Sequence, residues 1–112
     1  MEVSATSKYV RIAPRHVQTV ARDLRGMSTE EALAALAFLP HRSALAIAKV
    51  IKSAAANAEN NYGLAREQLV ISAVRIDKGP ALRRWRPKAR GRVGLFRRRS
   101  SHITVVVDDE AI

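Results

Sequence analysis

The chain has 112 residues and no cysteine, so its length suits one domain and its composition excludes disulfides and thiolate metal sites. Its 20 Lys and Arg residues outnumber ten acidic residues, which gives a formal net charge of +10 and favours a polyanionic partner. No apolar run resembles a signal peptide or approaches the roughly 20 residues of a membrane span, so we expect a soluble, cytoplasmic protein.

The N-terminal part of the chain predicts one strand and two helices. Residues 8–12 alternate apolar and polar side chains, as expected of a short half-buried strand. Pro14 suits the first turn of a helix, and Gly26 suits its left-handed C-terminal cap. Ser28 and an acidic residue three positions later form the capping box of a second helix, which Pro40 stops. The apolar stripes of these two helices contain Val17, Val20, Ala21 and Leu24, then Leu33, Leu36 and Ala37.

The third helix is predicted to be the longest, over residues 42–61, with Gly63 at its C-terminal end. Its apolar positions keep to one face over three turns: Ile47, Val50, Ile51, Ala54, Ala55 and Ala58. Because alanine contributes much of this face, the face must approach another element closely. We therefore interpret the third helix as the central core helix.

Two later stretches, residues 69–76 and 102–107, are rich in β-branched side chains and predict strands. If they pair antiparallel, the residues between them form a hairpin arm over about residues 78–99. Its bend would lie near residues 88–91, and at roughly 3.3 Å per residue the arm would reach about 35 Å from the sheet. The expected fold is α+β: three helices packed on a small three-stranded antiparallel sheet, with a long basic β-hairpin arm. We expect a single domain over residues 1–112.

The segment of residues 78–99 contains ten basic residues and no acidic residue, whereas the rest of the chain contains ten of each. The basic residues are Lys78, Arg83, Arg84, Arg86, Lys88, Arg90, Arg92, Arg97, Arg98 and Arg99. Arginine donors suit phosphate oxygens, so nucleic acid is the leading partner. A solvated or disordered tail is the alternative. Against a tail, the segment contains turn formers and apolar residues, and predicted strands flank it on both sides.

Five residues near these elements have two open interpretations each. Trp85 and Phe96 either pack across the two legs of the arm or stack on RNA bases. Asn57, Asn60 and Asn61, near the end of the third helix, either act as caps or contact RNA. The residue pattern alone does not decide between these alternatives.

Catalytic and metal-binding arrangements are not expected. His16, His41 and His102 lie in three separate elements without acidic partners at ligand spacing, so we interpret them as ordinary surface or RNA-facing residues. The run of residues 100–102 lacks an orienting carboxylate for a catalytic triad. The glycines of residues 91–94 do not open a helix and match no nucleotide-binding fingerprint. We therefore expect no enzyme activity and no cofactor.

Several segments, in order, resemble one known family. They are residues 9–12 before Pro14 and Arg15, residues 53–58 with Asn60 and Asn61, Gly79 and Pro80, residues 87–92, and residues 101–105. Together they are similar to the family of large ribosomal subunit protein 22, over about residues 8–107. Each piece alone is a weak signal, but their order and spacing make a strong one.

The resemblance implies a structural protein of the bacterial-type large ribosomal subunit that binds ribosomal RNA and supports assembly. In that family the globular part lies on the outer surface of the subunit, and the arm lines the peptide exit tunnel near the macrolide site. The implied partners are large-subunit ribosomal RNA, neighbouring ribosomal proteins and the nascent polypeptide, with the protein monomeric in the ribosome.

The resemblance and the charge pattern together assign two sets of site residues. The expected RNA-binding residues are Lys8, Arg11, Arg15, Lys78, Arg83, Arg84, Trp85, Arg86, Lys88, Arg97, Arg98, Arg99 and His102. The expected tunnel tip contains Lys88, Ala89, Arg90, Gly91 and Arg92.

Two other classes of protein compete with this interpretation. A free nucleic-acid-binding regulator would carry basic residues on a recognition helix, whereas here the helices are nearly balanced in charge. A protein that binds membrane surfaces would carry a basic amphipathic helix, which the glycines and prolines of the arm disfavour.

Overall fold

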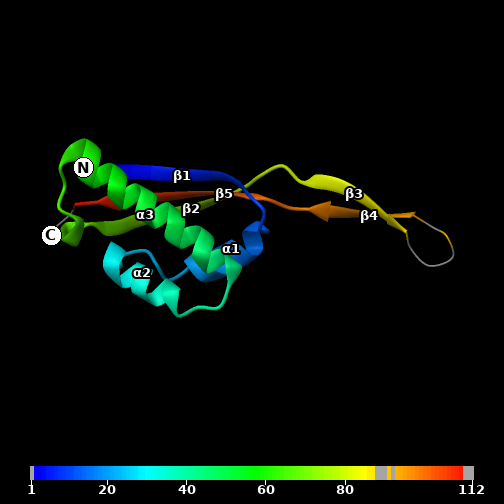
Figure 1. The fold of residues 1–112 in the computed structure, drawn as a ribbon, viewed down its shortest axis with the longest axis horizontal. Coiled ribbons are helices and arrows are strands. Elements are labelled where there is room, and N and C mark those ends of the chain that lie inside the picture. Colours follow the sequence, from blue (N-terminus) through cyan, green and yellow to red (C-terminus); the bar gives the residue numbers. More distant parts are fainter. Residues whose placement is uncertain (1, 88–90, 92, 110–112) are drawn as a thin grey trace.

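Three helices cover one face of a three-stranded sheet, and a separate two-stranded ribbon projects beyond them (Figure 1). The structure, a computed structural model, describes residues 2–87, 91 and 93–109. The elements are β1 (Glu2–Val10), α1 (Pro14–Ala21), α2 (Thr29–Ala37), α3 (Arg42–Tyr62), the 3-10 helix η1 (Arg66–Gln68), β2 (Val70–Lys78), β3 (Leu82–Pro87), β4 (Val93–Arg98) and β5 (Ser101–Asp108). This arrangement confirms the expected α+β class.

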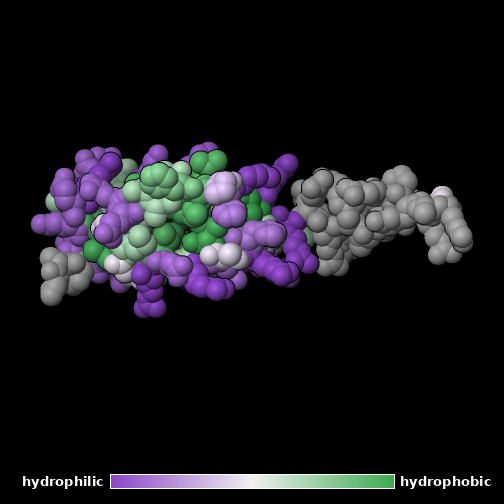
Figure 2. Space-filling view, turned by 90° about the horizontal axis from the view of Figure 1, so that it is seen from below, coloured by the Kyte–Doolittle hydropathy of each residue, from purple (hydrophilic) through white to green (hydrophobic). Residues whose placement is uncertain are grey.

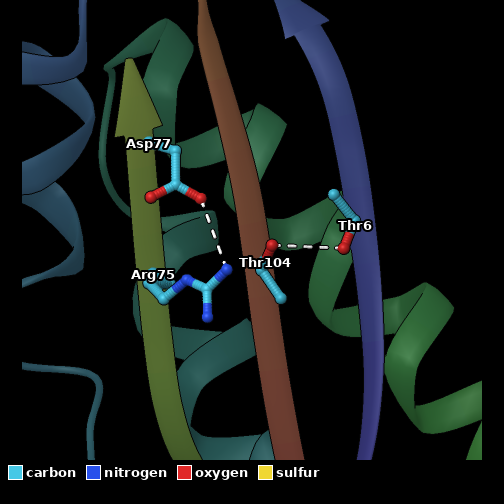
Figure 3. Close-up of polar contacts among 4 residues, drawn as sticks. All are labelled: Thr6, Arg75, Asp77 and Thr104. Carbon is cyan, nitrogen blue, oxygen red and sulfur yellow. Dashed lines mark hydrogen bonds and ion pairs between the residues drawn. The ribbon is translucent and has the colours of Figure 1, made fainter. Parts of the chain in front are cut away.

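Strand β5 is the centre of the main sheet, which has the order β1-β5-β2 with both pairings antiparallel. Alternate residues of β5 are buried beneath the helices: Ser101, Ile103, Val105 and Val107. The opposite face carries polar side chains, as expected of an antiparallel sheet covered on one side only. On that face Thr6 and Thr104 share a hydrogen bond of 3.1 Å across β1 and β5, and Arg75 pairs with Asp77 along β2 (Figure 3).

Helix α3 is the central element of the core, as its sequence predicts. It packs against β1 and β5 and also contacts α1 and α2. All six apolar positions of its predicted face are buried, and Ala54 and Ala58 have no exposed surface. The helix ends where Gly63 takes a φ of 66°, and the Gly63 N–H donates to the Glu59 carbonyl at 3.2 Å. Small side chains therefore let α3 lie close to the sheet.

The first strand differs from its prediction at both ends. It runs over Glu2–Val10 and not over residues 8–12, because Val3 and Ala5 are buried against α3 in a stretch whose serine and threonine residues weaken the apolar pattern. Its pairing with β5 is interrupted after Ser7, where Tyr9 takes a left-handed φ of 60°.

Three further details of the prediction also need correction. Helix α1 ends at Ala21, and Gly26, with a φ of 91°, lies in the following loop, where its N–H donates to the Ile71 carbonyl at 2.9 Å. Ala37 is exposed, since the buried stripe of α2 is shifted toward its N-terminus. Strand β2 begins at Val70, one residue later than predicted. The predicted Ser28 cap of α2 is confirmed by a 3.2 Å bond from the Glu31 N–H to the serine oxygen.

The arm is a ladder of its own and not a simple continuation of β2 and β5. The main sheet ends at the pair Lys78 and Ser101, and the arm ladder begins at Leu82 and Arg98. The molecule measures 62 × 26 × 18 Å, and its radius of gyration of 17.0 Å exceeds the roughly 13 Å of a compact domain of this size. The elongated shape is consistent with the predicted extended hairpin (Figure 1).

Candidate nucleic-acid interface

Five of the cations predicted to bind RNA belong to segments that meet where the arm leaves the domain. Strands β1 and β2 both run antiparallel to β5, so their last residues lie at the same end as the start of β5. Five exposed cations from these neighbouring segments form a group that we call the collar: Lys8, Arg11, Arg15, Lys78 and Arg99. Pairing of distant strands therefore brings together charges that are far apart in the sequence.

The surroundings of the collar are hydrophilic. In Figure 2, apolar side chains gather in the middle of the visible face, and hydrophilic side chains lie on both sides of them, toward the arm and toward the opposite end of the domain. The large exposed apolar residues of the helical region include Phe38, which is 87% exposed, and Leu45, which is 69% exposed. The surface of the domain next to the arm is therefore hydrophilic on this face, and the apolar patch lies away from it.

No carboxylate in the described part of the chain pairs with a collar cation. The ion pairs seen there use other cations: Arg66 Nε lies 3.1 Å from Glu59 Oε2, and an Arg75 nitrogen lies 3.6 Å from an Asp77 oxygen. Unpaired cations close together at one surface raise the local potential and attract a polyanion. The collar is therefore a group of exposed basic residues at the root of the arm.

The root of the arm is held by short polar contacts among Gly79, Pro80, Ser100 and Ser101, which we call the neck. Ser100 Oγ donates to the Pro80 carbonyl at 2.6 Å, and the Gly79 N–H donates to the Ser100 carbonyl at 3.0 Å. Ser101 Oγ donates to the Ile12 carbonyl at 2.5 Å. Because both serines are buried, these bonds connect the arm firmly to the sheet and to the β1–α1 connection.

His102 has a structural contact beside the neck in addition to its predicted RNA-binding role. Its Nδ1 accepts a 3.1 Å hydrogen bond from the Tyr9 N–H, and the two rings meet edge to face with centroids 5.0 Å apart. The bond holds Tyr9 in the left-handed conformation that ends the regular pairing of β1. The RNA contact predicted for His102 would therefore use its other ring nitrogen, Nε2.

The predicted arm residues fall on the two strands of the ribbon. Strand β3 carries Arg83, Arg84, Trp85 and Arg86, and β4 carries Arg97 and Arg98. The register pairs Trp85 with Leu95 and Arg84 with Phe96, so the two aromatic residues belong to successive pairs and do not form a cross-strand pair. Of the predicted tip, Gly91 is exposed with a φ of 71°, whereas Lys88, Ala89, Arg90 and Arg92 lie outside the described residues.

The structure places two further basic residues beside the collar, of which Arg42 was not among the expected RNA-binding residues. An open pocket of about 430 Å³ beside the collar is lined in part by His41 and Arg42. The sequence signal that could have identified this pocket is that neither α1 nor α3 has an acidic residue in its first turn. The structure also gives Asn57 a structural role, because its Nδ2 donates to the Ser4 carbonyl at 3.4 Å, while Asn60 and Asn61 are exposed.

Metal-binding clusters and membrane-spanning helices do not occur in the described part of the chain. Among the described residues, no three His, Asp or Glu side chains are placed to hold a metal ion. Within the same ranges, no helix is both long and apolar enough to cross a membrane.

Comparison with known proteins identifies the family. Residues 5–108 match the family described as Ribosomal protein L22p/L17e. The chain is 48% identical to large ribosomal subunit protein uL22 of Desulforamulus reducens, over 98% of this chain and 97% of that protein. It is 49% identical to the uL22 of Roseiflexus castenholzii, over 97% and 96% of the two chains. For the uL22 of a Thermotoga species the identity is 46%, over 99% of this chain and 70% of that protein. The chain therefore belongs to the ribosomal protein L22p/L17e family.

Proposed function

We propose that this protein is a structural constituent of the large ribosomal subunit and binds ribosomal RNA through its arm and its collar. Family membership supports a ribosomal role, carried out in cytoplasmic ribosomes and without enzyme activity. The unpaired collar cations support RNA as the partner, because arginine and lysine side chains neutralise phosphates and release counterions. A free regulatory protein finds no comparable support, since the basic residues lie on a ribbon and around its root and not along a recognition helix.

The main support for the proposal is the position and the charge of the arm. Among the described residues, a two-stranded ribbon on which no helix packs projects from the domain, and residues 78–99 contain all of the net charge of +10. An isolated two-stranded hairpin is at best marginally stable in water. Its self-repelling charges need a polyanion around them, and folded RNA supplies one.

We extend the proposal to the path of the arm. The arm passes through RNA to the peptide exit tunnel, and the tip, residues 88–92, contacts the nascent polypeptide near the macrolide site. The helical domain remains at the outer side, where its exposed Phe38 and Leu45 offer an apolar surface to a neighbouring ribosomal protein. In this arrangement the domain and collar anchor the protein as a monomer during assembly, and the arm acts on the tunnel.

The test is a paired deletion that shortens the arm without changing its register. Arg83 pairs with Arg97 and Arg84 with Phe96, so removing these two pairs keeps the alternation of faces and shortens the ribbon by roughly 7 Å. In a strain lacking the native copy, we expect the shortened protein to enter large subunits at normal stoichiometry while macrolide susceptibility and nascent-chain stalling change. Incorporation is measured by gradient sedimentation and mass spectrometry.

A second variant separates length from charge. Replacing Arg83, Arg84 and Arg97 with glutamine removes the same charges as the deletion but keeps the full arm. We expect it to weaken RNA binding without moving the tip. The proposal is wrong if the shortened protein enters subunits normally and leaves both drug response and stalling unaltered.

A further inference from the structure

A pocket at the arm end of the domain has the features of an anion site. It has a volume of about 430 Å³, within the range of roughly 300 to 1,000 Å³ that ligand pockets occupy. Its walls come from the β1–α1 connection and from the start of α3, two segments that meet at the end from which the arm leaves (Figure 1). Six lining residues determine its chemistry: Arg11, Ala13, His16, His41, Arg42 and Ser43.

The charged groups that line the pocket are basic. Arg11 and Arg42 contribute guanidinium groups, His16 and His41 contribute imidazoles, and no acidic residue lines it. None of these four side chains makes an ion pair or a side-chain hydrogen bond within the described residues. Their donors are therefore available to a ligand that accepts hydrogen bonds and carries negative charge.

Two helices begin at this pocket with their first amides uncapped. The N-terminal cap positions of α1 and α3 are Ala13 and His41, neither of which makes a side-chain capping bond, and neither helix has an acidic residue in its first turn. Helix α2 differs, because Ser28 caps it and Glu30 and Glu31 lie in its first turn. Free amides and the positive end of the helix dipole both attract an anion.

Ser43 contributes a hydroxyl group to the pocket. It is only 4% exposed and lies in the first turn of α3, where it lines the pocket. The fully buried side-chain oxygen that lacks a hydrogen-bond partner in the described part of the chain is Thr29 Oγ1, and Ser43 Oγ is not such an atom. Ser43 therefore adds one hydroxyl donor to the wall of the pocket, beside the free amides and the guanidinium groups.

We propose that this pocket binds a phosphodiester group of the ribosomal RNA and so forms a second anchor beside the root of the arm. The inference rests on the proposed function, because it assumes that RNA is the partner. The bond from Ser101 Oγ to the Ile12 carbonyl fixes the wall of the pocket to the neck. A phosphate held here is therefore in a fixed position relative to the direction in which the arm leaves.

The test uses the full-length protein and two matched charge reversals on α3. Arg42→Glu places a carboxylate in the pocket, and an acidic residue in the first turn favours the helix, so folding is not impaired. Lys49→Glu makes the same change in charge at an exposed position that does not line the pocket. Binding to large-subunit RNA is measured at several salt concentrations, and phosphorothioate footprinting locates the protected phosphates.

We expect Arg42→Glu to weaken binding by roughly tenfold or more relative to Lys49→Glu, because the variant cannot make the charge-assisted hydrogen bond. The log-log salt slope should fall in magnitude by about 0.7 to 0.9 for each phosphate that the variant no longer neutralises. A specific RNA phosphate should lose its protection in Arg42→Glu only. Equal effects of the two reversals on affinity and footprint would overturn the proposal.

One further measurement distinguishes an RNA phosphate from free phosphate as the ligand, and another distinguishes failure of the pocket proposal from failure of the proposed function. Inorganic phosphate, titrated into the isotope-labelled protein, should shift the amides of Arg42 and Ser43 only at far higher concentration than RNA does. Saturation by free phosphate with no protected RNA phosphate would contradict an RNA site. RNA binding by the wild-type protein that did not depend on salt would contradict the proposed RNA-binding function. If wild-type binding depends on salt but Arg42→Glu binds RNA as Lys49→Glu does, only the proposed phosphate site is wrong.

Discussion

At the scale of single residues, the neck depends on the absence of a side chain at position 79. A Cβ atom there would lie 2.6 Å from Ser100 Oγ and 3.3 Å from His102 Cε1. Ser100 is buried and already donates to the Pro80 carbonyl, so its hydroxyl has little freedom to move. Glycine is required here by the close approach of the two legs, because the residue makes no use of a positive φ.

We therefore predict that Gly79→Ala and Ser100→Ala are coupled. Each single change removes the hydrogen bond between Ser100 and Pro80 and should lower the free energy of unfolding by about 1 kcal/mol. In the double variant the added methyl group no longer meets the hydroxyl, so the combined cost should be clearly below the sum. Urea unfolding of the four proteins measures the coupling. Additivity within about 0.3 to 0.5 kcal/mol would show that the two positions act independently.

At the scale of elements, α3 sets the shape of the domain through the small side chains it presents to the sheet. Ala54 is fully buried, and its helix packs on β1 and β5 while supporting α1 and α2 on its other sides. A close-packed interior leaves little room for added methylene groups. The same helix begins at the proposed phosphate pocket, so its position also sets the geometry of the interface.

Ala54→Leu should overpack this contact and lower the free energy of unfolding by roughly 1 to 3 kcal/mol. Ala35→Leu is the matched control, because Ala35 is exposed on α2 and should change stability by less than about 0.5 kcal/mol. Thermal and urea unfolding measure both variants. A similar effect at the two positions would show that the α3 face is not closely packed.

The elements that the sequence predicts well are those with strong local signals. Helix α3 is recognisable from its period and from Gly63, and the start of α2 from Ser28, because each signal lies within the element itself or at its end. The true start of β1 is not recognisable in this way. Its residues become a strand by pairing with β5, about 100 positions along the chain, and its alternating serine and threonine residues carry little apolar signal. Tertiary pairing overrides weak local preference there.

At the scale of the whole molecule, the basic arm, the collar and the pocket all lie at one end of the sheet, opposite the pair formed by Glu2 and Asp108 (Figure 1). The arm and its charge are predictable from composition and from the strands on either side. The break between the two ladders is not, because it depends on the contacts of Gly79 and Ser100 across the neck. The pocket is not predictable from the sequence either, because it forms only when α1 packs against α3 and brings residues 11–16 beside residues 40–43.

The central claim is that the arm carries its tip to the nascent polypeptide while the helical domain stays away from it. The most direct measurement is site-specific photo-crosslinking in translating ribosomes, with a photoreactive residue placed at Ala89 in the predicted tip or at exposed Glu30 on α2. We expect Ala89 to crosslink to a radiolabelled nascent chain and Glu30 not to do so. Subunits that incorporate both proteins equally but show no crosslink from Ala89, or an equal one from Glu30, would contradict it.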